Sequence, residues 1–144
     1  MQYEKLFSEG RIGSVTIKNR VVMPPMEVGM ANPDGTPSEQ LIAYYEERAR
    51  NGLGLLITGI TRVNGRHGAT LPRQLAMTGD RHIEPFARMV ERVHAHGTKI
   101  FCQLHHPGRL WKSLMRAHLG DYEELEARLN KKSLSLSHGT AFRG

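Results

Sequence analysis

The sequence lacks most of the features that identify specialised protein classes. Its 144 residues contain one cysteine and one tryptophan, and aromatic residues make up only 6% of the chain. A single cysteine cannot form an internal disulfide, so a disulfide-stapled secreted domain is excluded. No apolar run approaches the roughly 20 residues that cross a bilayer, and the first residues lead into no signal-type apolar core. We therefore expect a cytoplasmic protein with no membrane partner.

The positive charge of the chain is not concentrated in any block. The formal net charge is +6 at pH 7, and a basic face is the electrostatic signature of nucleic-acid binding. Residues 1–108 carry 13 Lys and Arg against 10 Asp and Glu, and residues 109–144 carry 7 against 4, so each part contributes +3. The basic residues are not interleaved with aromatic ones. The sequence predicts no nucleic-acid partner.

The first 23 residues predict a small hairpin and then a short strand. Apolar residues over 10–18 lie around a turn at Gly13 and Ser14, which is the pattern of a hairpin too short to form a core. The strand over 20–23 is ended by Pro24 and Pro25, because proline cannot donate a ladder hydrogen bond.

The next segment predicts a helix and a buried strand. Thr36 can cap the helix, Pro37 suits its first position, and Glu39 completes a capping box. The helix is expected to run to about Asn51, where Gly52 supplies the stop. A near-continuous apolar strand is expected over residues 53–58. The buried stripe of the helix is predicted to consist of Leu41, Ile42, Tyr45 and Ala49.

A second helix and a third strand complete the pattern. The helix is expected over 83–96, with Phe86, Met89, Val90 and Val93 as its buried stripe and Gly97 as its stop; the strand is expected over 99–104. Alternating strands and helices with buried strands indicate repeated βαβ units. The predicted fold class is therefore α/β with a parallel sheet.

No fourth strand is predicted after residue 109. A short helix is possible over 110–119, and a second is predicted over 121–132, where Asp121 and Glu124 form a capping box. The Ser-rich residues 133–144 have no periodic apolar face. We thus expect residues 1–109 to form the α/β portion, 110–132 a helical extension and 133–144 a loose tail.

Three predicted strand ends carry groups that suit a flat heteroaromatic ring. Residues 24–27 offer main-chain groups, Gly59 has no side chain, and Gln103 presents a donor and an acceptor together. Such groups meet at the carboxyl ends of parallel strands. Each feature has a simpler alternative: a glycine after a strand is usually a turn, and a glutamine in a strand is usually solvated.

Four segments in this order and spacing resemble the Old Yellow Enzyme family. They are residues 19–26, 44–49, 52–58 and 103–109. More narrowly, they resemble the bacterial branch of NADH:flavin oxidoreductases and 2,4-dienoyl-CoA reductases, which includes enoate reductases. The resemblance covers about residues 3–109. It implies a (β/α)8 TIM barrel with FMN at the C-terminal rim, reduced by NADH or NADPH and oxidised by an activated alkene.

The resemblance also assigns residues. His106 and Arg109 match a family motif at the rim, whereas His105 and Glu27 depart from the small residue and the neutral or weakly polar residue common at those positions. The resemblance places the family's substrate-binding pair, usually His with His or Asn, and its proton-donating tyrosine, where present, on later strands, so no catalytic residue is expected here. No metal site is expected either; some relatives carry 4Fe-4S and FAD in a C-terminal extension. The implied FMN contacts are Pro24, Pro25, Met26, Glu27, Gly59 and Gln103.

Length conflicts with a complete barrel. Three βα units occupy about 105 residues here, and eight need roughly 250. The sequence therefore predicts an incomplete barrel with two open sheet edges, which could associate with the remaining barrel portion or with a second copy. Two functions remain open: an N-terminal piece of an FMN oxidoreductase, or a catalytically inert α/β chain acting as a small binding module.

Overall fold

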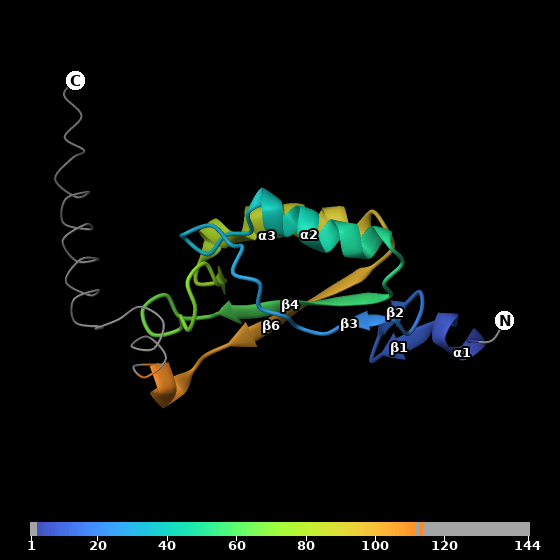
Figure 1. Cartoon of the computed structure of the whole chain (residues 1–144), viewed down its shortest axis with the longest axis horizontal. Coiled ribbons are helices and arrows are strands. Elements are labelled where there is room, and N and C mark those ends of the chain that lie inside the picture. Colours follow the sequence, from blue (N-terminus) through green and yellow to red (C-terminus); the bar gives the residue numbers. More distant parts are fainter. Residues whose placement is uncertain (1–2, 112, 114–144) are drawn as a thin grey trace, which may run out of the picture.

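The structure is a computed structural model that describes residues 3–111 and residue 113. It begins with the short helix α1 (Glu4–Phe7) and an antiparallel hairpin of β1 (Gly10–Ile12) and β2 (Val15–Ile17). The hairpin confirms the prediction, and its turn places Gly13 at φ 59°. Figure 1 shows the hairpin at one end of a larger sheet.

The larger sheet is parallel and is organised around its longest strand, β4. Leu55 of β4 pairs with Val22 on one side and with Lys99 on the other, so β3 and β6 lie on opposite edges of β4. The short strand β5 pairs with the far end of β4, on the same edge as β3. The predicted parallel α/β sheet is confirmed. Its strands are β3 (Val22–Met23), β4 (Leu55–Arg62), β5 (Leu75–Ala76) and β6 (Lys99–His105).

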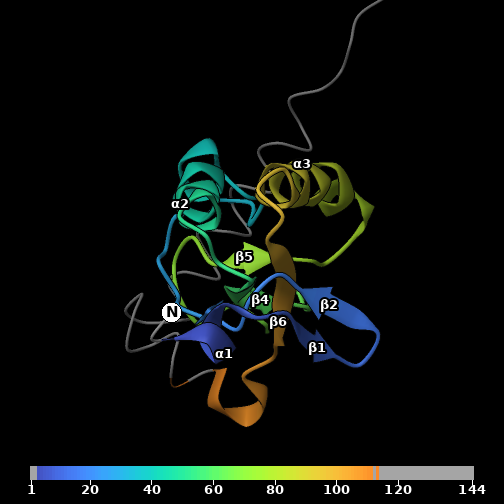
Figure 2. The same ribbon diagram turned by 90° about the vertical axis from the view of Figure 1, so that its right-hand side faces the viewer.

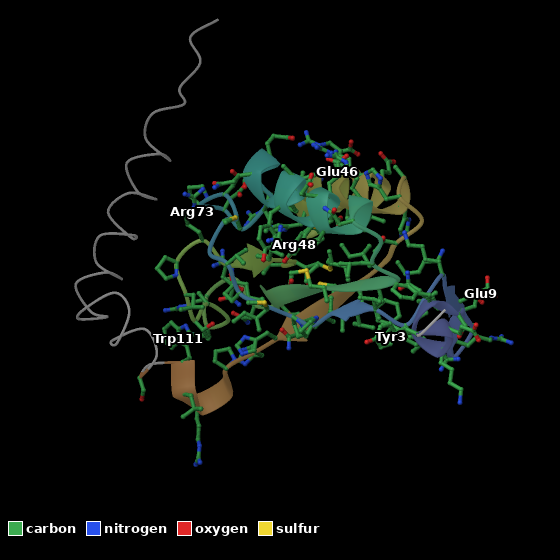
Figure 3. The ribbon with its side chains drawn as sticks, turned by 45° about the vertical axis from the view of Figure 1, so that its right-hand side comes forward. Tyr3, Glu9, Glu46, Arg48, Arg73 and Trp111 are labelled. Carbon is green, nitrogen blue, oxygen red and sulfur yellow. The ribbon has the colours of Figure 1, made fainter. Side chains whose placement is uncertain are left out.

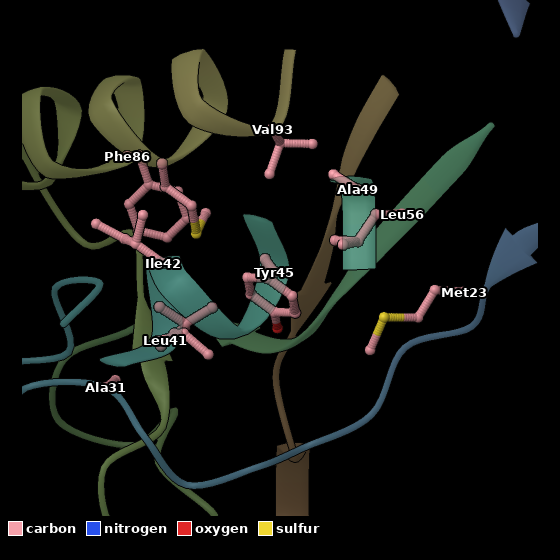
Figure 4. Packing of buried hydrophobic residues seen from close by; sticks show 11 residues of the cluster. Met23, Ala31, Leu41, Ile42, Tyr45, Ala49, Leu56, Phe86 and Val93 are labelled. Atoms are coloured by element: carbon pink, nitrogen blue, oxygen red, sulfur yellow. The ribbon is translucent and has the colours of Figure 1, made fainter. Parts of the chain in front are cut away.

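Two helices pack on one face of this sheet. They are α2 (Glu39–Arg50) and α3 (Ile83–His94), and Figure 2 shows both on the same side of the strands. The apolar stripes predicted for them form the core, except that Val90 is only half-buried. Figure 4 shows the packing. The core residues are Met23, Ala31, Leu41, Ile42, Tyr45, Ala49, Leu56, Leu75, Phe86, Met89 and Val93.

Helix α2 starts two residues later than predicted. Its N-cap is Ser38, whose Oγ accepts a hydrogen bond from the Leu41 N–H at 3.1 Å. Thr36, the predicted cap, instead donates from its N–H and its hydroxyl to Asp34 Oδ1, at 3.0 and 2.7 Å. The Asp34 carboxylate forms a local turn that engages Thr36, and the cap passes to the next hydroxyl after Pro37.

Strand β4 also continues beyond its predicted end. The expected strand stopped at Thr58, but β4 runs from Leu55 to Arg62 and contains Gly59. Ile57 pairs with Phe101, and Ile60 pairs with Gln103, so two residues of β4 oppose one residue of β6. This is a β-bulge, a device that tolerates glycine inside a strand. The predicted strand is too short because a glycine after an apolar run usually marks a turn, whereas Gly59 lies in a bulge.

Other boundaries differ less. The sequence predicts no strand between residues 58 and 83, yet this segment contains β5, which is anchored where the Ala76 N–H donates to the Gly35 carbonyl at 2.8 Å. Helix α3 ends at His94 rather than His96, and Gly97 follows at φ 68°. The helix predicted over 121–132 and the tail over 133–144 lie outside the described residues, as does most of 110–119.

The described part of the chain contains neither a membrane-spanning helix nor a cluster of metal-binding side chains. Across residues 3–111 and 113, no helix combines the length and apolarity that a bilayer crossing requires. Within the same residues, His, Cys, Asp and Glu side chains form no group of three or more that could hold a metal ion.

Candidate functional site

Strand β6 divides its side chains between the two faces of the sheet. Ile100 and Cys102 pack against the core beneath the helices. Because side chains alternate along a strand, Phe101, Gln103 and His105 point to the opposite face. We call this opposite side of β4 and β6 the open face.

Strand β4 contributes to the same open face. Paired residues of neighbouring strands share a face, so the register of β4 with β6 places three β4 residues beside these three. Leu56, by contrast, belongs to the core. The open face is therefore formed by Ile57, Ile60 and Arg62 with Phe101, Gln103 and His105.

Gln103 presents an unused amide on this face. Its backbone N–H donates to Thr58 Oγ1 at 3.2 Å, which ties β6 to the bulge of β4. Its half-buried side chain makes no hydrogen bond to any other described residue. An amide with a free donor and a free acceptor matches a ring edge that carries both groups.

Gly59 is packed against the segment that the sequence associated with it. A Cβ atom on Gly59 would lie 2.7 Å from the Met26 carbonyl oxygen and 3.2 Å from Glu27 Cα. The structure thus brings residues 26 and 27 onto the bulge of β4. Glycine is needed at position 59 for a reason that the sequence did not reveal, because the chain's own backbone approaches this position closely. Contact of Gly59 with a ring stays a prediction.

Tyr45 of helix α2 supports this junction from the helix side of the sheet. Its Oη accepts a hydrogen bond from the Gly59 N–H at 3.0 Å, and its side chain is only 1% exposed. Figure 4 shows the hydroxyl directed toward the strands. Burial raises the pKa of Tyr45 to about 12. The sequence suggested only helix packing for Tyr45, although a buried tyrosine hydroxyl generally has a partner.

Glu27 places a carboxyl group beside Gly59. Its Oε1 accepts from the Gly29 N–H at 3.0 Å, whereas Oε2 is buried and has no hydrogen-bond partner. Burial raises the pKa of Glu27, and hydrogen bonds from the Gly29 and Val28 N–H groups oppose that shift. The preceding residues Pro24, Pro25 and Met26 are exposed, so a ligand can reach their main chain.

The rim residues follow β6. His106 and Arg109 are exposed, and they line a groove of about 320 Å³ with His67, Gly108 and Trp111. The Trp111 side chain is buried, and its ring contacts the His67 ring edge-on at 4.7 Å between centroids. Figure 3 shows Trp111 at the far end of the molecule from Tyr3 and Glu9. The groove therefore lies at the C-terminal end of the sheet, and a role of His106 and Arg109 in ligand binding stays a prediction.

Comparison with known proteins identifies the family. Residues 5–139 match the profile of the NADH:flavin oxidoreductase / NADH oxidase family. The chain belongs to this family. It is 47% identical over 107 residues to an NADH oxidase of Thermoanaerobacter brockii and 43% identical over 107 residues to a cinnamate reductase of Clostridium sporogenes. These alignments cover 74% and 72% of the chain but only 16% of each relative.

This member of the NADH:flavin oxidoreductase family also shares its fold with solved Old Yellow Enzyme structures. The old yellow enzyme homologue from Zymomonas mobilis superposes with a TM-score of 0.66 at 34% identity. The match covers 74% of this chain and 29% of that one. The parallel α/β sheet described above therefore corresponds to the N-terminal part of an Old Yellow Enzyme TIM barrel. The family resemblance read from the four sequence segments is confirmed.

Proposed function

We propose that this chain forms the N-terminal strands of an FMN-dependent oxidoreductase that takes electrons from NADH or NADPH and reduces activated alkenes. The observation that carries the proposal is the free amide of Gln103, held on the open face beside the bulge at Gly59. The names of the two relatives, an NADH oxidase and a cinnamate reductase, support the electron donor and the substrate class. The chain spans 16% of their length, so the complete activity is assigned to the whole barrel.

Each residue of the site has a defined part in this proposal. FMN, when bound, supplies the hydride chemistry. Gln103 orients the ring through its donor and acceptor, and the exposed main chain of residues 24–26 borders the ring. Gly59 and Tyr45 hold residues 26 and 27 in place. Substrate binding and protonation belong to later strands, and a 4Fe-4S and FAD extension belongs to longer relatives.

A chimera tests the role of Gln103. The 107 aligned residues of the Thermoanaerobacter NADH oxidase are replaced by those of this chain, with Gln103→Leu as the test variant and Gln40→Leu, on exposed helix α2 surface, as the control. Loss of two hydrogen bonds should raise the Kd for FMN about tenfold or more. Fluorescence titration of the apoprotein with FMN gives this Kd directly.

Two results would count against the proposal. One is a chimera that folds but takes up no FMN; the other is equal FMN affinity for Gln103→Leu and Gln40→Leu. The 144-residue chain itself is mixed with FMN in parallel, and NADH-driven bleaching of a protein-perturbed flavin spectrum would exclude the inert-module alternative. Addition of the remaining barrel as a separate polypeptide tests whether association restores the site.

The carboxyl group of Glu27 should lower the reduction potential of the flavin. An ionised carboxylate beside the ring disfavours the anionic reduced form, so the chimera should have a midpoint potential roughly 20–60 mV below that of its Glu27→Thr variant. Because the pKa of Glu27 is raised, the difference should be present at alkaline pH and shrink as falling pH protonates the carboxyl. Redox titrations that place the Glu27→Thr potential lower would contradict this; Glu9→Thr, in the distant hairpin region, is the control.

A further inference from the structure

Arg62 and His105 are neighbours at the C-terminal end of the sheet. They are register partners and the last residues of β4 and β6. Adjacent strands lie about 4.8 Å apart, and both side chains belong to the open face. They form the next pair along that face after Ile60 and Gln103.

Each of these side chains has a buried nitrogen without a partner. Arg62 Nε and His105 Nδ1 are both inaccessible to solvent and make no hydrogen bond within the described part of the chain. Buried polar atoms are paired in the large majority of cases, and leaving one unpaired costs roughly 1–3 kcal/mol. Arginine Nε can only donate, so Arg62 requires an acceptor. His105 supplies a second donor in its Nδ1–H tautomer or as imidazolium.

The surrounding charges favour an anion as that acceptor. Arg62 is half-buried, and the described residues give it no ion pair. The nearby charged groups are Arg81 and Asp34. The Asp34 carboxylate already accepts the N–H and the hydroxyl of Thr36. Burial and Arg81 lower the pKa of Arg62, and the more weakly acting Asp34 carboxylate opposes them, so desolvation of the guanidinium outweighs the compensation that Asp34 provides.

The loop that covers Arg62 does not provide an acceptor. Asn64 Oδ1 accepts the N–H groups of Arg66 and His67 at 2.9 and 2.8 Å, so this oxygen is occupied in closing the loop. A Cβ atom on Gly68 would lie 3.1 Å from Arg62 Cβ. The loop thus packs directly on the stem of Arg62.

We propose that Arg62 and His105 bind an oxyanion, either a carboxylate or a phosphate group, at the C-terminal end of the open face. One oxygen accepts from Arg62 Nε and the other from His105 Nδ1, which satisfies both buried atoms. The carboxyl ends of parallel strands are where α/β proteins bind ligands. The site is built from this chain alone and does not depend on the flavin.

Anion titration of the 144-residue chain tests the site without flavin. The Nε–H resonance of Arg62 is followed by ¹H–¹⁵N NMR while sodium phosphate or sodium acetate replaces sodium chloride at constant ionic strength. Saturable shifts are expected for at least one oxyanion, and the preferred one identifies the ligand as phosphate or carboxylate. Arg62→Lys, which lacks the Nε donor, and His105→Gln should each weaken binding about tenfold, measured on backbone amides of β4 and β6.

The matched control is Arg11→Met, which removes one exposed positive charge from the hairpin at the other end of the sheet. It should bind oxyanions as the unaltered chain does. The inference is overturned if neither oxyanion produces a saturable shift beyond that of chloride. Equal affinity for the unaltered chain, Arg62→Lys and His105→Gln would overturn it as well, because binding would then reflect only general charge.

Discussion

Replacing Gly54 with alanine is expected to lower the free energy of unfolding by about 3 kcal/mol or more, since overpacking against rigid neighbours is costly. A Cβ atom at this position would lie 2.1 Å from the backbone oxygen of Asn19 and 2.7 Å from its Oδ1. Asn19 cannot easily move away. Its side chain donates to the Gly52 carbonyl at 2.7 Å and accepts from the Val21 N–H at 3.1 Å.

The same position joins the starts of three strands, which is why the effect should be large. The Gly54 N–H donates to the Val21 carbonyl, and the Gly54 carbonyl accepts from the Lys99 N–H, both at 3.0 Å. Urea denaturation of the 144-residue chain measures the change. Gly79→Ala is the control, because its extended φ of 168° suits any residue and a Cβ there meets nothing within 4 Å. Similar urea midpoints of unfolding for Gly54→Ala and Gly79→Ala would contradict the prediction.

Tyr45→Phe should cost roughly 1–3 kcal/mol, the penalty for leaving a buried donor unpaired. The substitution keeps the ring in the core but removes the acceptor of the Gly59 N–H. Residues 26 and 27 rest on Gly59, so their amide protons should exchange faster in the variant. Hydrogen exchange resolved by residue, together with urea denaturation, measures both effects. Tyr44→Phe is the control, because it also removes one tyrosine hydroxyl and keeps the ring. The adjacent Tyr44 ring packs under Arg48, with 3.3 Å between the guanidinium carbon and the ring centroid.

The same tyrosine predicts how stability depends on alkaline pH. The pKa of Tyr45 is about 12 in the folded chain, against about 10 for an unfolded tyrosine. The folded state therefore holds this proton more tightly, and the resulting stabilisation is complete below about pH 10 and lost as the pH rises toward 12. It amounts to about 2–3 kcal/mol. A Tyr45→Phe chain that loses stability over this pH range as steeply as the unaltered one would refute the assignment.

Much of the fold could be predicted because its signals are local. Helices α2 and α3 follow from apolar spacing and glycine stops, and their stripes are the core of the structure. The errors occur where tertiary contacts outweigh local preference. Asp34 engages Thr36 and leaves the helix cap to Ser38, and strand β5 is too short to have a sequence pattern of its own.

The functional site could be predicted less completely from the sequence than the fold. Gln103 and residues 24–27 could be assigned because they form a recognisable family pattern, and the structure places Met26 and Glu27 beside Gly59. The pairing of Arg62 with His105 could not be read in advance. It depends on the bulge at Gly59, which shifts the register by one residue and so decides which side chains share a face.

The unequal pairing of β4 has a consequence for synthesis on the ribosome. β4 pairs with two residues each of β3 and β5 but with six residues of β6. Because β6 is the last of these strands to be translated, one backbone edge of β4 stays unpaired until β6 has been synthesised. Helix α2 can form earlier from local contacts, whereas the sheet beneath it cannot. During the interval between translation of β4 and of β6, this edge of the nascent chain is therefore open to aggregation.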